Sequence, residues 1–238
     1  MIYVVMGDFH HPYLDKKAFH AALDVVCTFD DPHVVLLGDF LDCTSFSKYP
    51  KGLAERSSWK TEVREATKCL DDIGILTSNI HFLHGNHEAR FDTYITKQAP
   101  ELEGGVPPIS EVLGFEDRGI IDHGQAWYIP TLDLTFTHGS LVRKHSAYSA
   151  KAMQEKTGGS LMMGHTHRLG AFFYTDWNGT RRAYENGCLC RMDLPWLKDK
   201  PNWQQGFSVV YAEGTRFDVA QYFIQKGKVY DPSGGRWQ

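Results

Sequence analysis

The chain contains 238 residues, of which 42 % are hydrophobic and 23 % are charged; these proportions are typical of one folded domain and exclude a disordered chain. The formal net charge of −4 excludes a strongly basic nucleic-acid-binding protein. No apolar run reaches the roughly 20 residues of a membrane span, and Met1–His10 lack the features of a secretory signal, so we expect no membrane contact.

The first half of the sequence alternates apolar runs with amphipathic segments. The runs Ile2–Met6, Val34–Leu37 and Ile80–His84 predict buried strands. Between them, Lys16–Phe29 and Arg56–Ile73 carry apolar side chains at helical spacing. This β-α-β-α-β order predicts a parallel sheet covered by helices, and hence an α/β protein.

The second half is expected to be rich in strands and to complete a single domain over residues 1–238. One helix, over about Ala147–Lys156, interrupts the strands. A stretch at about 100–118, rich in Pro and Gly at its start, predicts a surface insertion. The expected strands are Trp127–Ile129, Leu132–Phe136, Leu161–Met163, Phe172–Tyr174, Phe207–Tyr211 and Val219–Phe223.

Polar residues follow the apolar strands at five places. In a parallel sheet, ligands bind in the crevice at the carboxyl ends of the strands, so these side chains are expected at one edge. Glycines precede several of them and fit loops that turn tightly beside a bound ion. The five segments are Asp8-Phe9-His10, Gly38-Asp39-Phe40-Leu41-Asp42, Gly85-Asn86-His87-Glu88, His138 and Gly164-His165-Thr166-His167.

The residue types in these segments point to metal binding. Asp8 and His10 lie two residues apart and point the same way if the strand remains extended, as do His165 and His167. Carboxylate, imidazole and amide groups together suit Mn, Fe, Zn or Ni. Seven such ligands exceed the roughly four to six positions of one ion, whereas two ions that share one carboxylate would use them all. Two-ion sites of this kind are a standard solution for hydrolysing phosphate esters.

Each segment alone also has an ordinary structural explanation. An Asp at a strand end often caps a helix or turn, Asn86 could occupy a left-handed turn, and His138 could be a buried histidine with satisfied hydrogen bonds. Two histidines beside a glycine at a strand end, as in Gly164–His167, have few structural roles. The occurrence of all five segments at apolar strand ends therefore favours a binuclear metal site.

In these residues the sequence resembles the calcineurin-like metallophosphoesterases, whose motifs occur here in family order from Asp8 to His167. The resemblance implies a four-layer α-β-β-α sandwich, with two mixed β-sheets flanked by helices. The length and the few insertions are similar to those of the compact microbial and bacteriophage phosphoesterases. If a bacteriophage encodes the chain, its expected location is the cytoplasm of the host cell.

The resemblance also implies a role for each residue. Asp39 would bridge two divalent metal ions, for which Mn is the first choice and Fe, Zn, Ni or Mg are the alternatives. His87 would contact the scissile phosphate or protonate the leaving group, Asp42 would hold His87 and support its charged form, and Asn86 would also contact the substrate. The remaining ligands divide into Asp8, His10 and His167 for one ion and Asn86, His138 and His165 for the other.

The mechanism that the resemblance implies is in-line attack on phosphorus by a hydroxide that bridges the two ions, with His87 as general acid. Arg90 lies in what is expected to be the first turn of a helix, where it could clamp a phosphate oxygen of the substrate. A surface salt bridge of Arg90 with Asp92 or Glu88 is an equally good explanation.

The sequence departs from the protein serine/threonine phosphatases of the family at Cys43, where those enzymes carry an arginine. A phosphodiester or a nucleotide-like phosphate ester is therefore the favoured substrate. The alternatives are a DNA or RNA nuclease, a phosphomonoesterase or protein phosphatase, and a catalytically silent binding module. Retention of all seven ligands and of His87 disfavours the silent module, and the net charge of −4 supplies no basic track for nucleic acid.

Several residues outside the motifs have mainly structural interpretations. The basic stretch from Arg143 to Lys156 could contact a polyanionic substrate, although a solvated helix face is the favoured interpretation. Trp177, Trp196 and Trp203 could stack on bases if exposed, but we expect them in the core.

The five cysteines are scattered along the chain, which is not a disulfide framework and predicts a reducing, cytoplasmic location. Cys188-x-Cys190 lacks a second cysteine pair, so a structural zinc site is not expected there. Histidines close to the motifs but not expected to be ligands are His11, His81 and His84.

Overall fold

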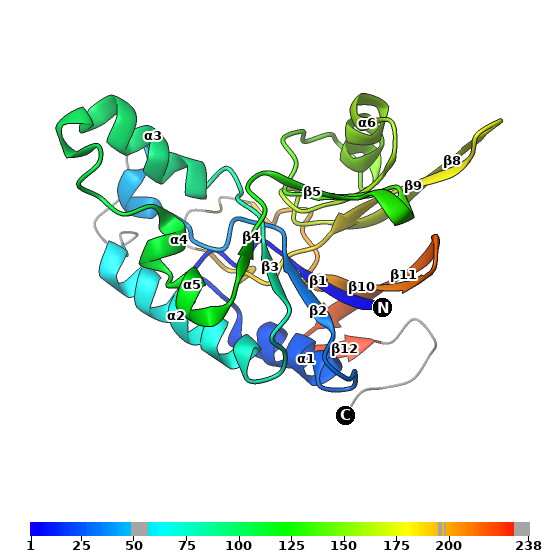
Figure 1. Cartoon of the computed structure of the whole chain (residues 1–238), viewed down its shortest axis with the longest axis horizontal. Coiled ribbons are helices and arrows are strands. Elements are labelled where there is room, and N and C mark those ends of the chain that lie inside the picture. Colours follow the sequence, from blue (N-terminus) through cyan, green and yellow to red (C-terminus); the bar gives the residue numbers. More distant parts are fainter. Residues whose placement is uncertain (49–56, 195–196, 198, 231–238) are drawn as a thin grey trace.

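The computed structural model describes residues 1–48, 57–194, 197 and 199–230, which form two mixed β-sheets flanked by helices (Figure 1). The larger sheet has the strand order β12 (Lys228–Tyr230), β11 (Arg216–Gln225), β10 (Gly206–Glu213), β1 (Ile2–Met6), β2 (His33–Leu36), β3 (Ile80–Phe82) and β4 (Ile121–Asp122). The smaller sheet has the order β5 (Ala126–Ile129), β6 (Leu134–Thr137), β7 (Ser160–Met163), β9 (Gly179–Asn186) and β8 (Leu169–Asp176).

The two longest N-terminal helices begin at capping residues. The Asp15 carboxylate accepts hydrogen bonds from the backbone at the start of α1, and the Ser58 hydroxyl does so for α2. The expected start of the second helix, Arg56, lies outside the described residues. The described α-helices are α1 (Lys16–Val26), α2 (Trp59–Gly74), α3 (Glu88–Gln98), α4 (Ile109–Val112), α5 (Phe115–Arg118) and α6 (Tyr148–Thr157), with short 3₁₀ helices η1 (Thr44–Phe46), η3 (Pro100–Leu102) and η4 (Pro130–Leu132).

Buried apolar clusters divide the molecule into four layers. Phe19 of α1 and Leu70 of α2 pack in the cluster on one face of the larger sheet. Val35 of β2 and Phe136 of β6 belong to the cluster between the sheets, and Ala150 of α6 packs on the smaller sheet. Figure 1 shows α1 and α2 on one side of the molecule and α6 on the other. The predicted four-layer α-β-β-α sandwich is therefore confirmed.

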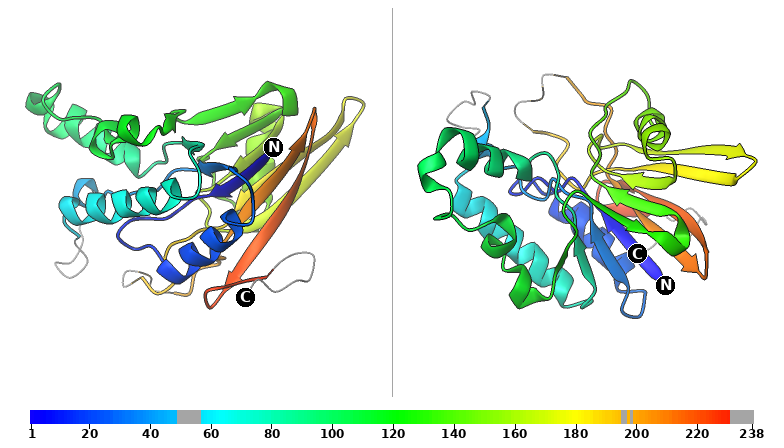
Figure 2. Two further views of the ribbon diagram at one scale, coloured as in Figure 1. Left: turned by 60° about the horizontal axis from the view of Figure 1, so that its bottom comes forward. Right: turned by 45° about the horizontal axis from the view of Figure 1, so that its top comes forward.

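The β-rich second half contains a long hairpin that the sequence pattern did not fully predict. Strand β8 extends well beyond Phe172–Tyr174. Its partner β9, which lies between β7 and β8, was not expected, because Arg181, Arg182 and Glu185 interrupt any apolar run in its sequence. Figure 2 shows this hairpin and the β10–β11 hairpin projecting away from α3. Trp177, expected in the core, lies in the turn of the β8–β9 hairpin and is fully exposed. Trp196 lies outside the described residues.

The stretch at 100–118 is more than a surface insertion. It contains η3, α4 and α5, and it buries Ile109, Leu113 and Phe115 in the cluster beneath the larger sheet. These helices have about one turn each, which is too short for an apolar periodicity to emerge. Among the helices of the described residues, none has the length and apolar character that a membrane crossing requires.

A row of three hydrogen-bonded histidines, from β2, β3 and the residue after β4, lies between the sheets. Nε2 of His81 is 2.8 Å from Nδ1 of His33, and Nδ1 of His81 is 2.9 Å from Nε2 of His123. The His81 ring also stacks on Trp127, with ring centroids 4.2 Å apart. Burial, and then the neighbouring imidazoles, lower the pKa of His81 to about 4. Burial also lowers the pKa of His33 and His123, although a nearby aspartate opposes each shift.

We expect this histidine row to destabilise the metal-free protein in acid. Because the pKa of His81 lies below its ordinary value, the unfolded chain binds more protons than the folded chain, and the free energy of unfolding falls as pH falls from about 6.5 toward 4. Urea denaturation of wild type and His81→Gln, both in excess chelator, measures this contribution. The stability advantage of wild type should shrink across that range, whereas a constant difference would contradict the assignment. His20→Gln, on the exposed face of α1, is the control.

Candidate metal centre

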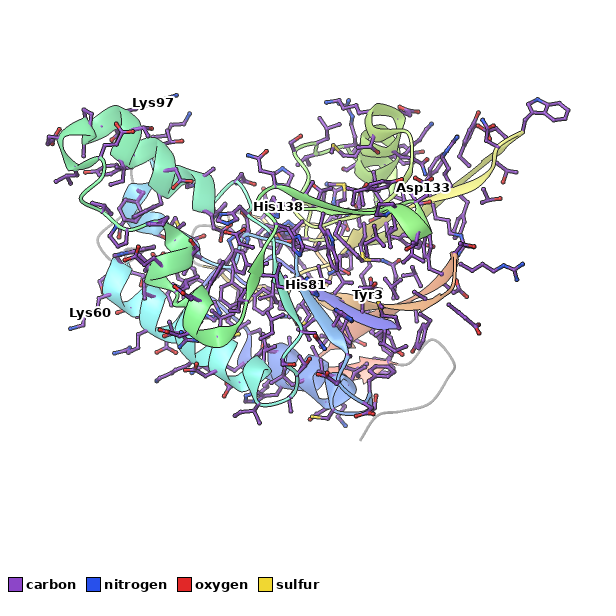
Figure 3. The ribbon with its side chains drawn as sticks, viewed as in Figure 1. Tyr3, Lys60, His81, Lys97, Asp133 and His138 are labelled. Carbon is purple, nitrogen blue, oxygen red and sulfur yellow. The ribbon has the colours of Figure 1, made fainter. Side chains whose placement is uncertain are left out.

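The loops that follow β1, β2, β3, β6 and β7 converge at one edge of the two sheets. Strands β1, β2 and β3 are parallel and in register, with Met6 opposite Leu36 and Leu36 opposite Phe82. Strands β6 and β7 are also parallel. Residues that follow these strands therefore meet, and Figure 3 shows His138 between α3 and α6. All seven residues that the sequence singled out as metal ligands lie in this group of loops.

The first group of donors consists of Asp8, His10 and His167. Nε2 of His167 lies 3.2 Å from Oδ1 of Asp8 and 3.0 Å from Nε2 of His10. Nε2 of His10 lies 3.9 Å from the same carboxylate oxygen. All three side chains are buried, and their donor atoms lie close enough together to share one ion. Two imidazoles and a carboxylate suit a borderline divalent ion such as Mn, Fe or Zn.

The second group surrounds His138. Its Nε2 lies 3.2 Å from Oδ2 of Asp39 and 3.2 Å from Nδ1 of His165. The amide oxygen of Asn86 lies 3.1 Å from the same Nε2. Unlike the buried histidine and aspartate, Asn86 is exposed, so this side of the centre is open to solvent.

Asp39 lies between the two groups. Its Oδ1 accepts a hydrogen bond of 2.8 Å from the backbone N–H of His87. Its Oδ2 faces both groups, at 3.2 Å from Nε2 of His138 and 3.9 Å from Nε2 of His10. The donors thus fall into the two sets that the family resemblance implies, with Asp39 placed to bridge them. Their role as metal ligands stays a prediction.

The backbone at the centre differs from the extended geometry expected for Asp8 and His10. Strand β1 ends at Met6, and both residues have left-handed φ values, 53° and 52°. His165 and His167 are also left-handed, with φ of 71° and 56°. The side chains therefore converge because the loops turn sharply, not because the strands continue. Such backbone costs free energy and is typical of functional sites, where the surrounding structure holds it in place.

Glu88 holds two of these loops together beneath the centre. Its buried carboxylate accepts hydrogen bonds from the backbone N–H groups of Asp39, Leu41 and Gly85, at 2.9, 2.9 and 2.8 Å. Burial, and then the nearby Asp39, raise the pKa of Glu88, while the backbone donors oppose the shift. The sequence had suggested no structural role for Glu88. Its position directly after the Gly-Asn-His segment was the feature that could have indicated one.

Two glycines are required by close packing around the centre. A Cβ on Gly85 would collide with the backbone and carboxylate of Asp39. A Cβ on Gly164 would lie 2.8 Å from Oδ2 of Asp8. These two glycines thus leave room for the carboxylates of Asp39 and Asp8.

Hydrogen bonds on the far side of each ring direct the ligand nitrogens inward. Nδ1 of His138 lies 2.8 Å from the carbonyl oxygen of Leu37, which accepts its proton and leaves Nε2 for the centre. Nδ1 of His167 lies 3.9 Å from Sγ of Cys190. Cys188, Cys190 and His167 also form a compact group of possible donor atoms. The expectation that this cysteine pair does not form a structural zinc site stays a prediction. The contact between Cys190 and His167 joins segments far apart in sequence, so no local pattern could predict it.

Asp42, His87 and Arg90 form a linked set beside the centre. Oδ1 of Asp42 lies 3.2 Å from Nδ1 of both His10 and His87, and the Asp42 carbonyl oxygen lies 2.9 Å from Nδ1 of His87. Burial opposes ionisation of Asp42, but hydrogen bonds from the two histidines outweigh it and lower its pKa well below the usual range. Asp42 therefore orients His87, as expected.

Arg90 makes neither of the salt bridges considered for it. Its Nη1 donates to the Asp42 carbonyl oxygen at 3.0 Å, and its Nη2 lies 2.6 Å from Nε2 of His87. A guanidinium has no acceptor, so Nε2 of His87 accepts this hydrogen bond and carries no proton. His87 is therefore neutral in this arrangement, which differs from the charged form expected from the sequence.

The charges around the centre favour cations. Burial opposes ionisation of Asp39, but the charge of His138 outweighs it and lowers the pKa of Asp39 well below the usual range. Burial opposes protonation of His138, but Asp39 raises its pKa to about 10. Burial likewise opposes protonation of His167, but Asp8 raises its pKa to about 10. Without metal ions, the centre therefore holds protons where cations would bind.

A cavity of about 280 Å³ opens over the centre. Asn86, His87 and Arg90 form part of its wall, together with the metal-ligand candidates. Trp203 lines another part and lies 4.2 Å from His167 between ring centroids. It is half-buried at the site, not in the apolar core where the sequence analysis placed it.

The remaining candidates of the sequence analysis lie outside the cavity. His11 is buried against Phe40, and His84 pairs with Asp122 at 3.0 Å. No residue of the basic stretch from Arg143 to Lys156 is part of the cavity wall that the described residues form.

The sequence matches the calcineurin-like phosphoesterase family over residues 1–169. The chain belongs to this family. It is 29 % identical to the Gene 54 protein of Mycobacterium phage D29, over 99 % of this chain and 98 % of that protein. It is 28 % identical to the Gene 54 protein of Mycobacterium phage L5, over 89 % of each. The family binds divalent metal ions, and the oxygen and nitrogen donors described above fit such ions.

Solved structures of the same fold include Vps29 proteins. Vacuolar protein sorting 29 from Cryptosporidium parvum has a TM-score of 0.53 and 15 % identity, over 96 % of this chain and 93 % of that one. A single mutant of Vps29 from Entamoeba histolytica has a TM-score of 0.52 and 15 % identity, over 96 % of each chain. At this identity the likeness establishes the shared fold alone.

Replacing Asp39 with asparagine should remove most of the bound metal. The amide retains the size of the side chain but loses the charge that both donor groups would share, so metal content should fall from about two ions per chain to well below one. Elemental analysis by mass spectrometry after gel filtration measures this. Asp92→Asn, on the exposed face of α3, should keep its metal. Full occupancy in Asp39→Asn would contradict the bridging role.

Metal binding should release protons, since a ligand nitrogen cannot hold a proton and an ion together. Because the pKa of His138 and of His167 is about 10, both imidazoles are protonated at neutral pH in the metal-free protein. We expect release of about two protons per chain near neutral pH, and weaker binding as pH falls. Calorimetric titration with Mn²⁺ in buffers of different ionisation enthalpy counts these protons. If the heat of binding does not depend on the buffer, no protons are released, and this prediction is wrong.

Proposed function

We propose that the protein is a metal-dependent phosphodiesterase that acts on nucleotide-like phosphate esters. The proposal is carried by the pairing of two donor groups around Oδ2 of Asp39, below an open cavity that also presents His87 and Arg90. When bound, two divalent ions at these positions would activate water and neutralise negative charge on a phosphoryl group. Mn is the first choice of ion, because the seven donors are oxygen and nitrogen atoms without a thiolate.

Arg90 and His87 would act on the two sides of the ester bond. A phosphate oxygen competes for Arg90 through a charge-assisted hydrogen bond, which is stronger than the bond to a neutral imidazole. When Arg90 turns to the phosphate, Nε2 of His87 becomes free to hold a proton and donate it to the leaving oxygen. Asp42 keeps the ring in place through Nδ1 during this exchange.

The position of Cys43 argues against a protein phosphatase. Cys43 stands where those enzymes carry an arginine, and here it is buried in the apolar cluster under the larger sheet. Among the described residues, the guanidinium that lines the cavity over the centre is instead that of Arg90 in α3. A nuclease or a phosphomonoesterase remains an alternative with the same centre, but the net charge of −4 gives a nuclease little support.

A catalytically silent binding module is the second candidate function, because Vps29 proteins share the fold. The complete set of seven donors, with His87 and Arg90 beside it, supports catalysis over that alternative. The relatives from two mycobacteriophages support action in the cytoplasm of an infected cell as part of this proposal.

Metal-loaded protein should hydrolyse bis-p-nitrophenyl phosphate faster than p-nitrophenyl phosphate. A chelator first removes bound metal, and Mn, Ni, Zn or Mg is then added to the metal-free protein. Release of nitrophenol measures the rate for each ester. Faster diester cleavage with Mn would support the proposal, and faster monoester cleavage would favour a phosphomonoesterase. Loss of activity toward both esters, despite two bound ions, would favour the binding module.

Replacing His87 with alanine should leave both ions bound but lower turnover by about 100-fold, the scale of general acid catalysis. The loss should be larger for phenyl than for nitrophenyl esters, because a poor leaving group depends more on the proton. Metal content and the rates of both esters are measured together. His145→Ala, which lies outside the described cavity wall, is the control. An equal loss for the two leaving groups would argue that His87 does not supply the proton.

A further inference from the structure

A second cavity, of about 230 Å³, adjoins the metal-centre cavity along α3. The two cavities share Ser47, Asn86 and Arg90 in their walls, so they are direct neighbours, and we call the second cavity the α3 groove. The second cavity is smaller than the roughly 300–1,000 Å³ of a typical small-molecule site, so it has room for one small chemical group beside the phosphate. Its wall is completed by Phe46, Lys48, Ala89, Thr93, Tyr94 and Gln98.

The wall of this α3 groove has the chemistry that recognises a nucleobase. The half-buried Tyr94 ring lies 5.4 Å from Phe46 between centroids. Phe46 in turn packs on Phe91 and Trp59, at 4.9 and 5.0 Å, so core residues hold the aromatic surface in place. Aromatic surfaces bind bases by stacking, and amides such as that of Gln98 can hydrogen-bond to base edges.

Two cations border the same groove. Arg90 lies at the boundary with the metal centre, and Lys48 lies in the wall of the α3 groove with an exposed side chain. Positive charge beside an aromatic surface is the combination that single-stranded nucleic acids and nucleotides select. A purely apolar substituent in the α3 groove would gain no charge interaction from Lys48.

We propose that the α3 groove binds the nucleoside part of a nucleotidyl phosphodiester whose phosphate lies at the metal centre. The other ester substituent lies on the opposite side, where Trp203 and Leu194 form part of the wall. A diester, with a group on each side of the phosphorus atom, occupies both the metal-centre cavity and the α3 groove. A monoester has no second group to place. This inference rests on the proposed function and names its substrate class.

Two synthetic diesters with the same leaving group test the inference. Thymidine 5′-p-nitrophenyl phosphate carries a nucleoside, and methyl p-nitrophenyl phosphate carries a methyl group in its place. Metal-loaded wild-type protein should cleave the thymidine ester with a kcat/KM about tenfold higher or more, the scale of one base–aromatic contact. The ratio of the two kcat/KM values reports nucleoside recognition, because both esters release nitrophenol.

Variants of the groove locate the effect. Tyr94→Ala should lower the ratio by about tenfold, while Tyr94→Phe, which keeps the ring, should retain most of it. Lys48→Ala, at an exposed position, gives a second test that does not depend on the packing of Tyr94. It should lower kcat/KM for a substrate with a further phosphate, thymidine 3′-phosphate 5′-p-nitrophenyl phosphate, more than it lowers kcat/KM for the thymidine ester without that phosphate. Tyr148→Ala and Lys97→Ala replace exposed residues outside the groove as matched controls.

The outcomes separate this inference from the proposed function. Equal kcat/KM for the two diesters, or a ratio that Tyr94→Ala does not change, would overturn the α3 groove as a nucleoside site while leaving the phosphodiesterase intact. Failure to cleave either diester with two ions bound would overturn the proposed function itself. A ratio that falls in Tyr94→Ala and returns in Tyr94→Phe would support the inference.

Discussion

One carboxylate oxygen, Oδ2 of Asp39, faces both groups of donors, and the arrangement of the centre depends on it. The other oxygen is held by the backbone of His87, so the carboxylate cannot turn away. Glu88 lies beneath it as a second buried carboxylate. Burial, and then the charge of Asp39, raise the pKa of Glu88. Two neighbouring buried carboxylates are tolerated only where hydrogen bonds and cations balance them. Backbone donors satisfy Glu88, the protonated His138 faces Asp39 in the metal-free protein, and divalent ions are the natural replacement.

The two sheets supply the rigidity that this balance requires. Parallel strands end together, so the polar residues after β1, β2 and β3 reach one edge, and β6 and β7 bring theirs from the facing sheet. The left-handed backbone at Asp8, His10 and Asp39 costs free energy. Hydrogen bonds between loops hold it, such as that from His10 N–H to the Asp39 carbonyl oxygen at 2.9 Å. The strain is thus supported by the four-layer core.

Much of this arrangement could be predicted from the sequence, because local patterns encode it. Apolar strands that end in Gly-Asp, Gly-Asn-His or Gly-His-Thr-His predict both the parallel sheet and the edge where the polar residues meet. The pattern could not show that the backbone turns at Asp8, since strand residues and left-handed residues look alike in sequence. Contacts between distant segments were also beyond it, including those of Cys190 with His167 and of Trp203 with the centre. The exposed Trp177 shows the converse limit, because a tryptophan at a hairpin turn has no partner layer to cover it.

Helix α3 joins the chemistry of the centre to the recognition of substrate. Asn86 and the N-cap residue His87 precede its first residue, Glu88, and Arg90 lies in its first turn. Thr93, Tyr94 and Gln98 continue the same face at intervals of three and four residues, so one side of the helix runs from the metal centre into the α3 groove. A base stacked on Tyr94 would hold the adjoining phosphate against Arg90, and Arg90 would then release Nε2 of His87. A phosphate ester without a base lacks this hold, so Arg90 would leave Nε2 of His87 for a smaller share of the time. In the proposed mechanism, a single side chain would therefore link substrate recognition to the availability of the proton.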